Sequence, residues 1–118
     1  MLKLRLRMDF APQAYEEASA VLRSLVGPVR AESGCCATGL LTNVEEELTL
    51  TWVEEWRSAE DFEQHLQTPA FRKILAVMEL SSVPPVMEID DVSSRRGFDM
   101  VEEILNRVRT GGSTDVES

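Results

Sequence analysis

The sequence is poor in the residues that form metal sites and disulfide frameworks. It contains one histidine and two cysteines, and the two cysteines, Cys35 and Cys36, are adjacent. Neighbouring side chains of a strand point to opposite faces, so these two cannot form an ordinary structural disulfide with each other. No CxxC pattern is present and the Cys/His spacing of a zinc site is missing, although this argument does not cover a site built from carboxylates. We expect no structural metal, and nothing in the sequence locates a cofactor.

Long apolar runs and an excess of basic residues are also absent. Residues 1–7 alternate between apolar and charged side chains instead of forming the apolar core of a signal peptide. No later stretch approaches the ~18 apolar residues of a membrane-spanning helix. Twelve basic residues against 21 acidic ones give a net charge of −9, which repels the phosphate backbone of nucleic acids. We therefore expect a cytoplasmic protein that binds neither membranes nor nucleic acids.

The first half of the chain contains three strand patterns and one helix pattern. Hydrophobic residues make up 43% of the 118 residues, enough for one domain to bury a core without disulfides. Residues 2–9 alternate between apolar and charged side chains, which is typical of a strand. Apolar residues at steps of three and four after Pro12 predict a helix that ends near residues 27–34. Residues 35–44 and 47–56, separated by a short polar stretch, predict a hairpin.

The second half contains two signals for the start of a helix. Ser58 to Asp61 resembles a capping box, with Asp in place of the usual Glu. Thr68 and Pro69 then suit the N-cap and the first position of a second helical segment. After two prolines, residues 86–92 predict a short strand. A C-terminal amphipathic helix, which needs a surface to pack on, is predicted from the spacing of Val101, Ile104, Leu105 and Val108.

The order βαββαβ predicts an α+β fold of the ferredoxin-like type, with an antiparallel sheet and helices on one face. We assign residues 1–96 to this domain, 97–110 to an added C-terminal helix packed on the domain or on a dimer partner, and 111–118 to a disordered tail. Neither face of the strand at 47–56 is purely polar, so both faces should be at least partly buried. A second copy of the chain on the open face would achieve this, and we therefore expect a homodimer.

The segment from Leu50 to Phe71 combines a strand ending in Glu-x-Trp, a helix ending in His-Leu, a small-residue cap and a Phe. Together with Ser33-Gly34-Cys35 and the closing residues 92–97, this pattern resembles the antibiotic biosynthesis monooxygenase family, which includes small quinol monooxygenases. The resemblance covers most of residues 1–100. It implies a dimeric α+β barrel, in which two sheets close on each other, and in some members oxygenation of quinols or other electron-rich aromatics without a cofactor.

Other members of that family degrade heme, and the sequence departs from their pattern. The resemblance places a Trp of the heme-degrading branch at His65, an Asn within residues 1–9, and an iron-ligating His four residues after Phe71. This chain has the histidine, no Asn in the first strand, and Leu75. Because leucine cannot coordinate iron, we expect no heme binding by that route.

Two residues are candidates for acid–base catalysis. His65, the only histidine, could act as a general base toward a phenolic substrate. Alternatively, it packs at the helix break and bonds to backbone. Glu54 shares a strand face with two tryptophans, whose rings could favour its protonated form and make it an acid or a base. The alternative is an ion pair with Arg5 or Arg7 across the sheet.

Four aromatic residues form a candidate substrate pocket for an aromatic ring, between sheet and helices, although each could equally be part of the core: Trp52, Trp56, Phe62 and Phe71. Three basic residues of the first strand could bind an anionic substrate or compensate the acidic charge of the chain: Lys3, Arg5 and Arg7. The two cysteines could be redox-active or behave as small apolar residues.

The resemblance implies a cofactor-independent monooxygenase that acts on a quinol or polyphenolic substrate, and in this chain His65 or Glu54 would remove a proton. The alternative is a non-catalytic dimeric module that binds a small hydrophobic ligand or stabilises a partner protein. The two hypotheses differ in a measurable way. The enzyme consumes oxygen with a quinol in the absence of flavin and metal, whereas the module shows only saturable ligand binding.

Overall fold

The structure, a computed structural model, describes residues 1–112 of the chain. It confirms the predicted βαββαβ order, with the second helix divided into two segments, and adds the C-terminal helix. The elements are β1 (Leu2–Asp9), α1 (Pro12–Arg30), β2 (Cys35–Thr42), β3 (Thr49–Trp56), α2 (Ala59–His65), α3 (Pro69–Met78), β4 (Val86–Asp91) and α4 (Phe98–Arg107), followed by a π-helical turn, Val108–Gly112. Residues 113–118 of the predicted tail lie outside the described residues.

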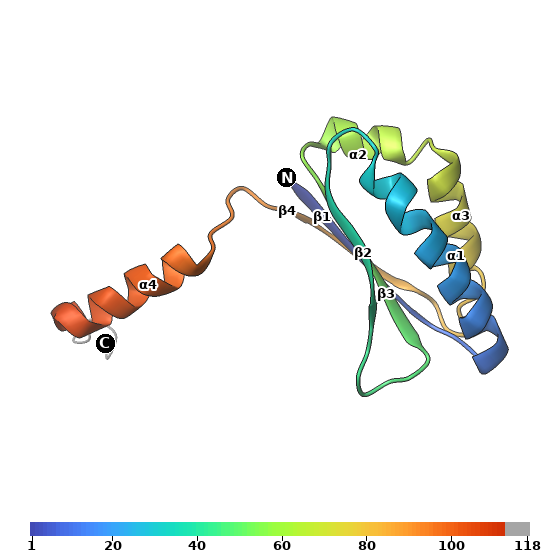
Figure 1. Cartoon of the computed structure of the whole chain (residues 1–118), viewed down its shortest axis with the longest axis horizontal. Coiled ribbons are helices and arrows are strands. Elements are labelled where there is room, and N and C mark those ends of the chain that lie inside the picture. Colours follow the sequence, from blue (N-terminus) through green and yellow to red (C-terminus); the bar gives the residue numbers. More distant parts are fainter. Residues whose placement is uncertain (113–118) are drawn as a thin grey trace.

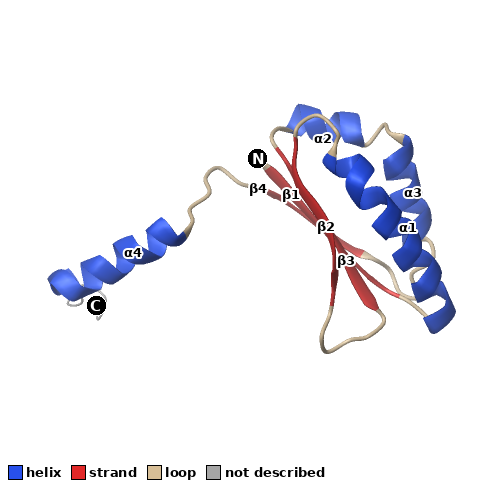
Figure 2. Ribbon diagram, in the orientation of Figure 1, coloured by secondary structure: helices blue, strands red, loops and turns tan. Residues whose placement is uncertain are grey.

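The four strands form one antiparallel sheet in the order β2-β3-β1-β4. Helices α1, α2 and α3 cover one face of this sheet, and the other face is open (Figure 2). Leu4 lies opposite Glu54 and Leu6 opposite Trp52, so these four side chains share the helix-covered face. The register therefore puts Arg5 and the other basic residues of β1 on the open face.

The core lies between the sheet and the helices. Alternate residues of β1 are buried there, as the sequence pattern predicted, together with one stripe of α1. In α3, Ile74 and Val77 are buried, whereas Leu75 is 43% exposed, so the buried side of α3 contains Ile74 and Val77 and not Leu75. Each large side chain buried in this way contributes about 1.5–3 kcal/mol. The buried apolar residues are Leu4, Leu6, Met8, Phe10, Ala18, Leu22, Leu25, Val29, Leu50, Trp52, Trp56, Ile74 and Val77.

Both helix-start signals of the sequence are confirmed. The Ser58 hydroxyl accepts a hydrogen bond from the backbone N–H of Asp61 at 3.2 Å, and α2 begins at the next residue after this cap. The Thr68 hydroxyl accepts from the N–H of Phe71, also at 3.2 Å, and Pro69 is the first residue of α3. The cap of α3 at Thr68 follows soon after the last residue of α2, His65. The position of the His65 side chain is therefore fixed by the end of one helix and the start of the next.

The turn between α1 and β2 depends on Gly34, the single residue with a positive φ (+81°) in residues 1–112. A Cβ atom at this position would overlap the carboxyl group of Asp61. That carboxyl is held by the hydroxyl of Ser58 at 2.9 Å and by Arg57. The backbone carbonyl of Gly34 accepts a hydrogen bond from Arg57 N–H at 2.8 Å, so the turn is tied to the start of α2.

We expect Gly34→Ala to destabilise the protein by at least about 1–2 kcal/mol, because an L-residue is strained in the left-handed region. The displaced Asp61 side chain adds to this loss. Urea unfolding measures the change. The matched control is Gly27→Ala, since Gly27 lies inside α1 with nothing within 4 Å of a new Cβ. Because Gly27 precedes Pro28, which disfavours a helical conformation of a residue with a Cβ, the usual helical gain is offset, and the control should change stability by less than about 1 kcal/mol. Equal effects of the two substitutions would contradict the role assigned to the turn.

Helix α4 lies on the open side of the sheet, away from α1, α2 and α3 (Figure 1). Every residue of α4 is exposed in the single chain. The radius of gyration, 18.5 Å, exceeds the ~13–14 Å of a compact domain of this length, which reflects the projecting helix. The predicted packing of α4 on the domain or on a dimer partner stays a prediction. Within residues 1–112, no helix has both the length and the apolar content to cross a membrane.

Candidate functional site

A buried carboxylate with three hydrogen-bond partners lies at the centre of the helix-covered face. Glu54 is 1% exposed. Its Oε1 accepts a hydrogen bond from the indole N–H of Trp56 at 2.9 Å, and its Oε2 accepts from the indole N–H of Trp52 at 2.7 Å. The third partner is His65, whose Nε2 lies 2.9 Å from the same Oε2. Because indole N–H groups only donate, this arrangement suits an ionised carboxylate.

His65 connects this carboxylate to a second one nearer to solvent. The ring is fully buried, and its Nδ1 lies 2.9 Å from Oε1 of Glu32, whose side chain is 20% exposed. Both ring nitrogens therefore face carboxylate oxygens. We call the three residues Glu32, His65 and Glu54 the carboxylate–histidine chain.

Aromatic rings surround the imidazole. Trp56 stacks on it with ring centroids 4.7 Å apart and an interplanar angle of 29°. Phe71 meets it edge-on at 5.5 Å, and Phe62 lies at 6.4 Å. A protonated imidazole on the face of an indole gains electrostatic attraction, more so where water is excluded. The surroundings thus favour a charged His65 as well as holding its ring in place.

The pKa of His65 is raised above its usual 6.5 by the balance of two opposing effects. Burial, the largest single effect, lowers this pKa because it disfavours the charged ring. The hydrogen bond and negative charge of Glu54, followed by those of Glu32, outweigh burial and raise it.

Three different elements bring these side chains together. The period of two in β3 places Trp52, Glu54 and Trp56 on one face, as the sequence predicted. His65 is the last residue of α2, where the cap at Ser58 and the restart at Thr68 fix it. Glu32 comes from the turn that Gly34 closes, directly after α1.

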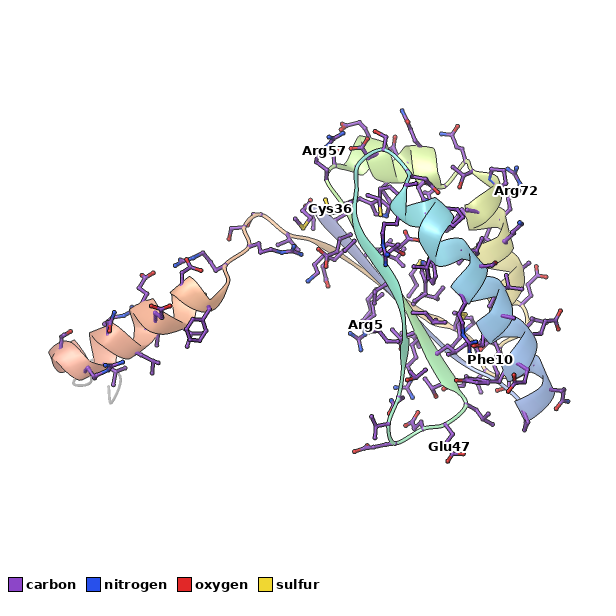
Figure 3. All side chains as sticks on the ribbon, in the orientation of Figure 1. Arg5, Phe10, Cys36, Glu47, Arg57 and Arg72 are labelled. Carbon is purple, nitrogen blue, oxygen red and sulfur yellow. The ribbon has the colours of Figure 1, made fainter. Side chains whose placement is uncertain are left out.

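The structure corrects both alternatives considered from the sequence for these residues. Pairing of Glu54 with Arg5 or Arg7 is wrong, because the register puts those arginines on the opposite face of the sheet, and Arg7 pairs with Glu46 instead. Figure 3 shows Arg5 on the open side of the sheet. Bonding of the His65 ring to backbone is also wrong, since both nitrogens bond to carboxylates.

Sequence reasoning missed Glu32. It lies 33 residues before His65, in a loop, and no spacing or motif distinguishes it from the other 20 acidic residues of the chain. The link of Glu54 to two indole N–H groups was also missed, although the shared strand face predicted that the three side chains are neighbours.

Of the four predicted pocket residues, Trp52 and Trp56 are completely buried, and Phe62 and Phe71 are partly buried against the core. The structure thus gathers Trp56, Phe62 and Phe71 around His65. Substrate binding by these residues stays a prediction. A cavity of about 180 Å³ does adjoin the site, lined by Glu32, Ser33, Asp61, Gln64, His65 and Thr68.

Two further cavities lie elsewhere. One of about 240 Å³ is lined by residues of β1, β3 and β4, including Lys3, Arg5 and Glu54. The largest, about 430 Å³, lies between α1 and α3 and contains no member of the carboxylate–histidine chain. Because size alone does not supply acid–base chemistry, the cavity beside His65 is the candidate site.

The other reactive residues have less favourable surroundings. Burial, and next the charge of Glu54, raise the pKa of the Cys35 thiol, which disfavours the reactive thiolate. Within residues 1–112, no cluster of three or more His, Cys, Asp and Glu side chains has an arrangement that would hold a metal ion.

Comparisons with solved structures identify the fold. Rv0793 from Mycobacterium tuberculosis is 23% identical, with a TM-score of 0.73 over 81% of this chain and 98% of that one. A structure described as an antibiotic biosynthesis monooxygenase is 22% identical, with a TM-score of 0.71 over 80% of this chain and 100% of that one. PA3566 from Pseudomonas aeruginosa is 26% identical, with a TM-score of 0.69 over 79% and 94%.

Among curated proteins, none matches the sequence significantly. The family comparison gives a clear result, because the sequence model of the antibiotic biosynthesis monooxygenase family matches residues 1–77, about two-thirds of the chain. The match includes β1, β2 and β3 and every residue of the carboxylate–histidine chain. The chain therefore belongs to the antibiotic biosynthesis monooxygenase family.

Proposed function

We propose that the protein is a cofactor-independent monooxygenase that oxidises a quinol or polyphenol with molecular oxygen, and that it works as a homodimer. The observation that carries the proposal is the buried His65, held between two carboxylates and bordering a cavity that also contains Glu32. A buried titratable chain with a raised histidine pKa next to a cavity is a typical acid–base site. Family membership supports the same reaction class.

In the proposed reaction the substrate supplies the electrons and the protein moves protons. A phenolic O–H gives its proton to the carboxylate–histidine chain through Glu32, the member that lines the cavity with its carboxylate partly exposed. The phenolate then transfers one electron to O2, and the resulting radical and superoxide combine as a peroxide on a ring carbon. The chain returns the proton to the outer peroxide oxygen. Loss of the proton on that ring carbon breaks the O–O bond, which leaves a carbonyl and releases water.

The substrate would enter beside His65. The cavity there, about 180 Å³, is smaller than the ~300–1,000 Å³ of ordinary small-molecule sites. Phe62 and Phe71, both only partly buried beside the imidazole, are the side chains that would move to admit an aromatic ring. Trp56, packed flat on His65, would stay in place as the inner wall.

A second copy on the open face is supported by the sheet itself. Val53 and Leu41 place apolar side chains there, and Leu41 is 47% exposed. The same face carries alternating charge, because Lys3 lies between Glu55 on one neighbouring strand and Asp90 on the other. A two-fold related copy presents the same pattern and can match it.

Oxygen uptake by the metal-stripped protein with a panel of reduced quinones tests the reaction, read against the autoxidation of each quinol. We expect turnover above background, and a loss of roughly 10²–10⁴-fold in Glu32→Gln, because Glu32 is the proposed proton acceptor and general acid–base catalysis contributes about that much. The matched control is Glu63→Gln, an exposed carboxylate on α2 outside the chain of contacts. A trace equal to autoxidation with every quinol would contradict the proposal.

One observation favours a second candidate, the non-catalytic ligand-binding module. The polar atoms of His65 and Glu54 are all satisfied within the cluster, as expected of a structural network. In that case quinols or other aromatics would raise the melting temperature saturably and consume no oxygen.

A further inference from the structure

Helix α4 has an apolar stripe that nothing covers. Its residues lie at positions i, i+3, i+4 and i+7 along the helix, and they are between 40% and 47% exposed: Val101, Ile104, Leu105 and Val108. A ten-residue helix is marginal in water by itself, so contacts made by this stripe must supply most of its stability. An exposed apolar stripe of this kind marks an interaction surface.

The chain's own open sheet face is a poor surface for this stripe. The side chains of β1 on that face are Lys3, Arg5 and Arg7, and those of β4 include Glu88 and Asp90. Burying apolar side chains against these charges would remove the charges from water without adding a hydrogen-bond partner for any of them. The receiving surface must therefore lie elsewhere.

An apolar groove of suitable size runs between α1 and α3. It has a volume of about 430 Å³, and its apolar lining consists of Val21, Ala76, Val77 and Leu80. Docking of an amphipathic helix through side chains at i, i+3, i+4 and i+7 is a common mode of recognition for such grooves. The groove and the stripe are thus complementary in chemistry.

Charges at the two ends of the groove favour one orientation of α4. Helices α1 and α3 run in opposite directions (Figure 1), so Glu17 near the start of α1 and Lys73 near the start of α3 lie at opposite ends of the groove. Glu102 on α4 borders the first half of the stripe, and Arg109, in the π-helical turn that follows α4, borders its end. A helix lying parallel to α3 brings Glu102 to Lys73 and Arg109 to Glu17.

The groove that α4 can fill belongs to a second copy rather than to its own chain. The sheet separates α4 from its own α1 and α3 (Figure 1). Arg95, in the linker before α4, pairs with Glu55 on the open face and holds the linker on that side. Facing sheets are ~10 Å apart, and the six linker residues 92–97 span at most ~20 Å, so α4 can pass the edge of a facing copy and reach its helices.

The geometry points to α4 as an arm that docks in the α1–α3 groove of a second copy of this chain. This contact lies outside the carboxylate–histidine chain and beyond the proposed reaction. Two solved structures of this fold match about four-fifths of this chain while being covered over almost their whole length. The unmatched fifth is about the length of the segment from α4 onward.

Disulfide trapping between differently tagged chains tests the arm. Both chains carry Cys35→Ser and Cys36→Ser, one adds Leu105→Cys on the stripe, and the other adds Ala76→Cys in the groove. We expect mixing and mild oxidation to give at least about tenfold more covalent heterodimer than the matched control Glu103→Cys, on the opposite side of α4, because disulfide formation requires Cα atoms within ~7 Å. Yields equal to the control would overturn the inference.

A single chain with both Leu105→Cys and Ala76→Cys separates the two possible origins of the contact. A disulfide that forms within this chain, with no covalent dimer, would mean that α4 folds back on its own domain, and it would also overturn the inference. Hydrogen exchange of the unmodified protein gives an independent reading. Protection of the α4 amides should rise with protein concentration if a second copy covers the helix, and protection that is independent of concentration contradicts this. Neither measurement depends on oxygen uptake.

Discussion

The single histidine of this protein should titrate with a pKa above 6.5 in nuclear magnetic resonance, and Glu54→Gln should lower that pKa. The native value is raised because the hydrogen bonds and charges of Glu54 and Glu32 outweigh the effect of burial. A neutral amide at position 54 removes the stronger of these carboxylates, while burial continues to favour the uncharged ring. With one histidine in the chain, the imidazole signal needs no assignment.

The same shift makes the stability of the protein depend on pH, with a defined sign. A histidine whose pKa is raised in the folded state stabilises that state fully below about pH 6.5, its unfolded pKa. This contribution is lost as the pH rises through the folded pKa. Urea unfolding across this window should therefore show stability falling with pH in the native protein and less so in Glu54→Gln. A pKa at or below 6.5, or a flat profile in the native protein, would rule out an ionised carboxylate–histidine chain.

Replacement of His65 by alanine should be the most destabilising single change in the site, by about 3–5 kcal/mol, because it leaves the buried charge of Glu54 without its ionic partner. The cavity left by the ring among Trp56, Phe62 and Phe71 adds to this cost. Glu32→Gln, at a partly exposed carboxylate, should cost only about 1 kcal/mol and serves as the control. Urea unfolding at neutral pH measures both.

A double-mutant cycle separates loss of the pair from loss of packing. If the cost of His65→Ala comes mainly from an unpaired charge, adding Glu54→Gln should cost much less in the His65→Ala background than in the native protein. If the loss of stability in the double variant equals the sum of the two single losses, the two side chains are not energetically coupled. That result would contradict the ion pair assigned to His65 and Glu54.

Local signals in the sequence predict most of the fold. The alternation in β1 gives its buried face, and the caps at Ser58 and Thr68 give the starts of α2 and α3. These features depend on residues only a few positions apart, so their physical causes can be recognised in the chain alone. The common face of Trp52 and Glu54 follows from the period of a strand in the same way.

The candidate site depends on contacts that no local pattern encodes. Glu32 reaches His65 only because the turn at Gly34 and the end of α2 meet in space. The expected partner of Glu54 was on the wrong side of the sheet, because the register of β1 against β3 decides which arginines face it. The helical stripe of α4 was predicted correctly as amphipathic, but periodicity says only that a partner surface exists and does not say where it lies.

The stacking of Trp56 on His65 gives the protein an internal optical reporter. The chain has two tryptophans, and both donate a hydrogen bond to Glu54, so all of the indole emission originates within this one cluster. Because the His65 ring stacks on Trp56, we expect the emission of that indole to change when His65 gains or loses its proton. Binding of an aromatic molecule or unfolding of the chain should be detectable through the same two rings without any label.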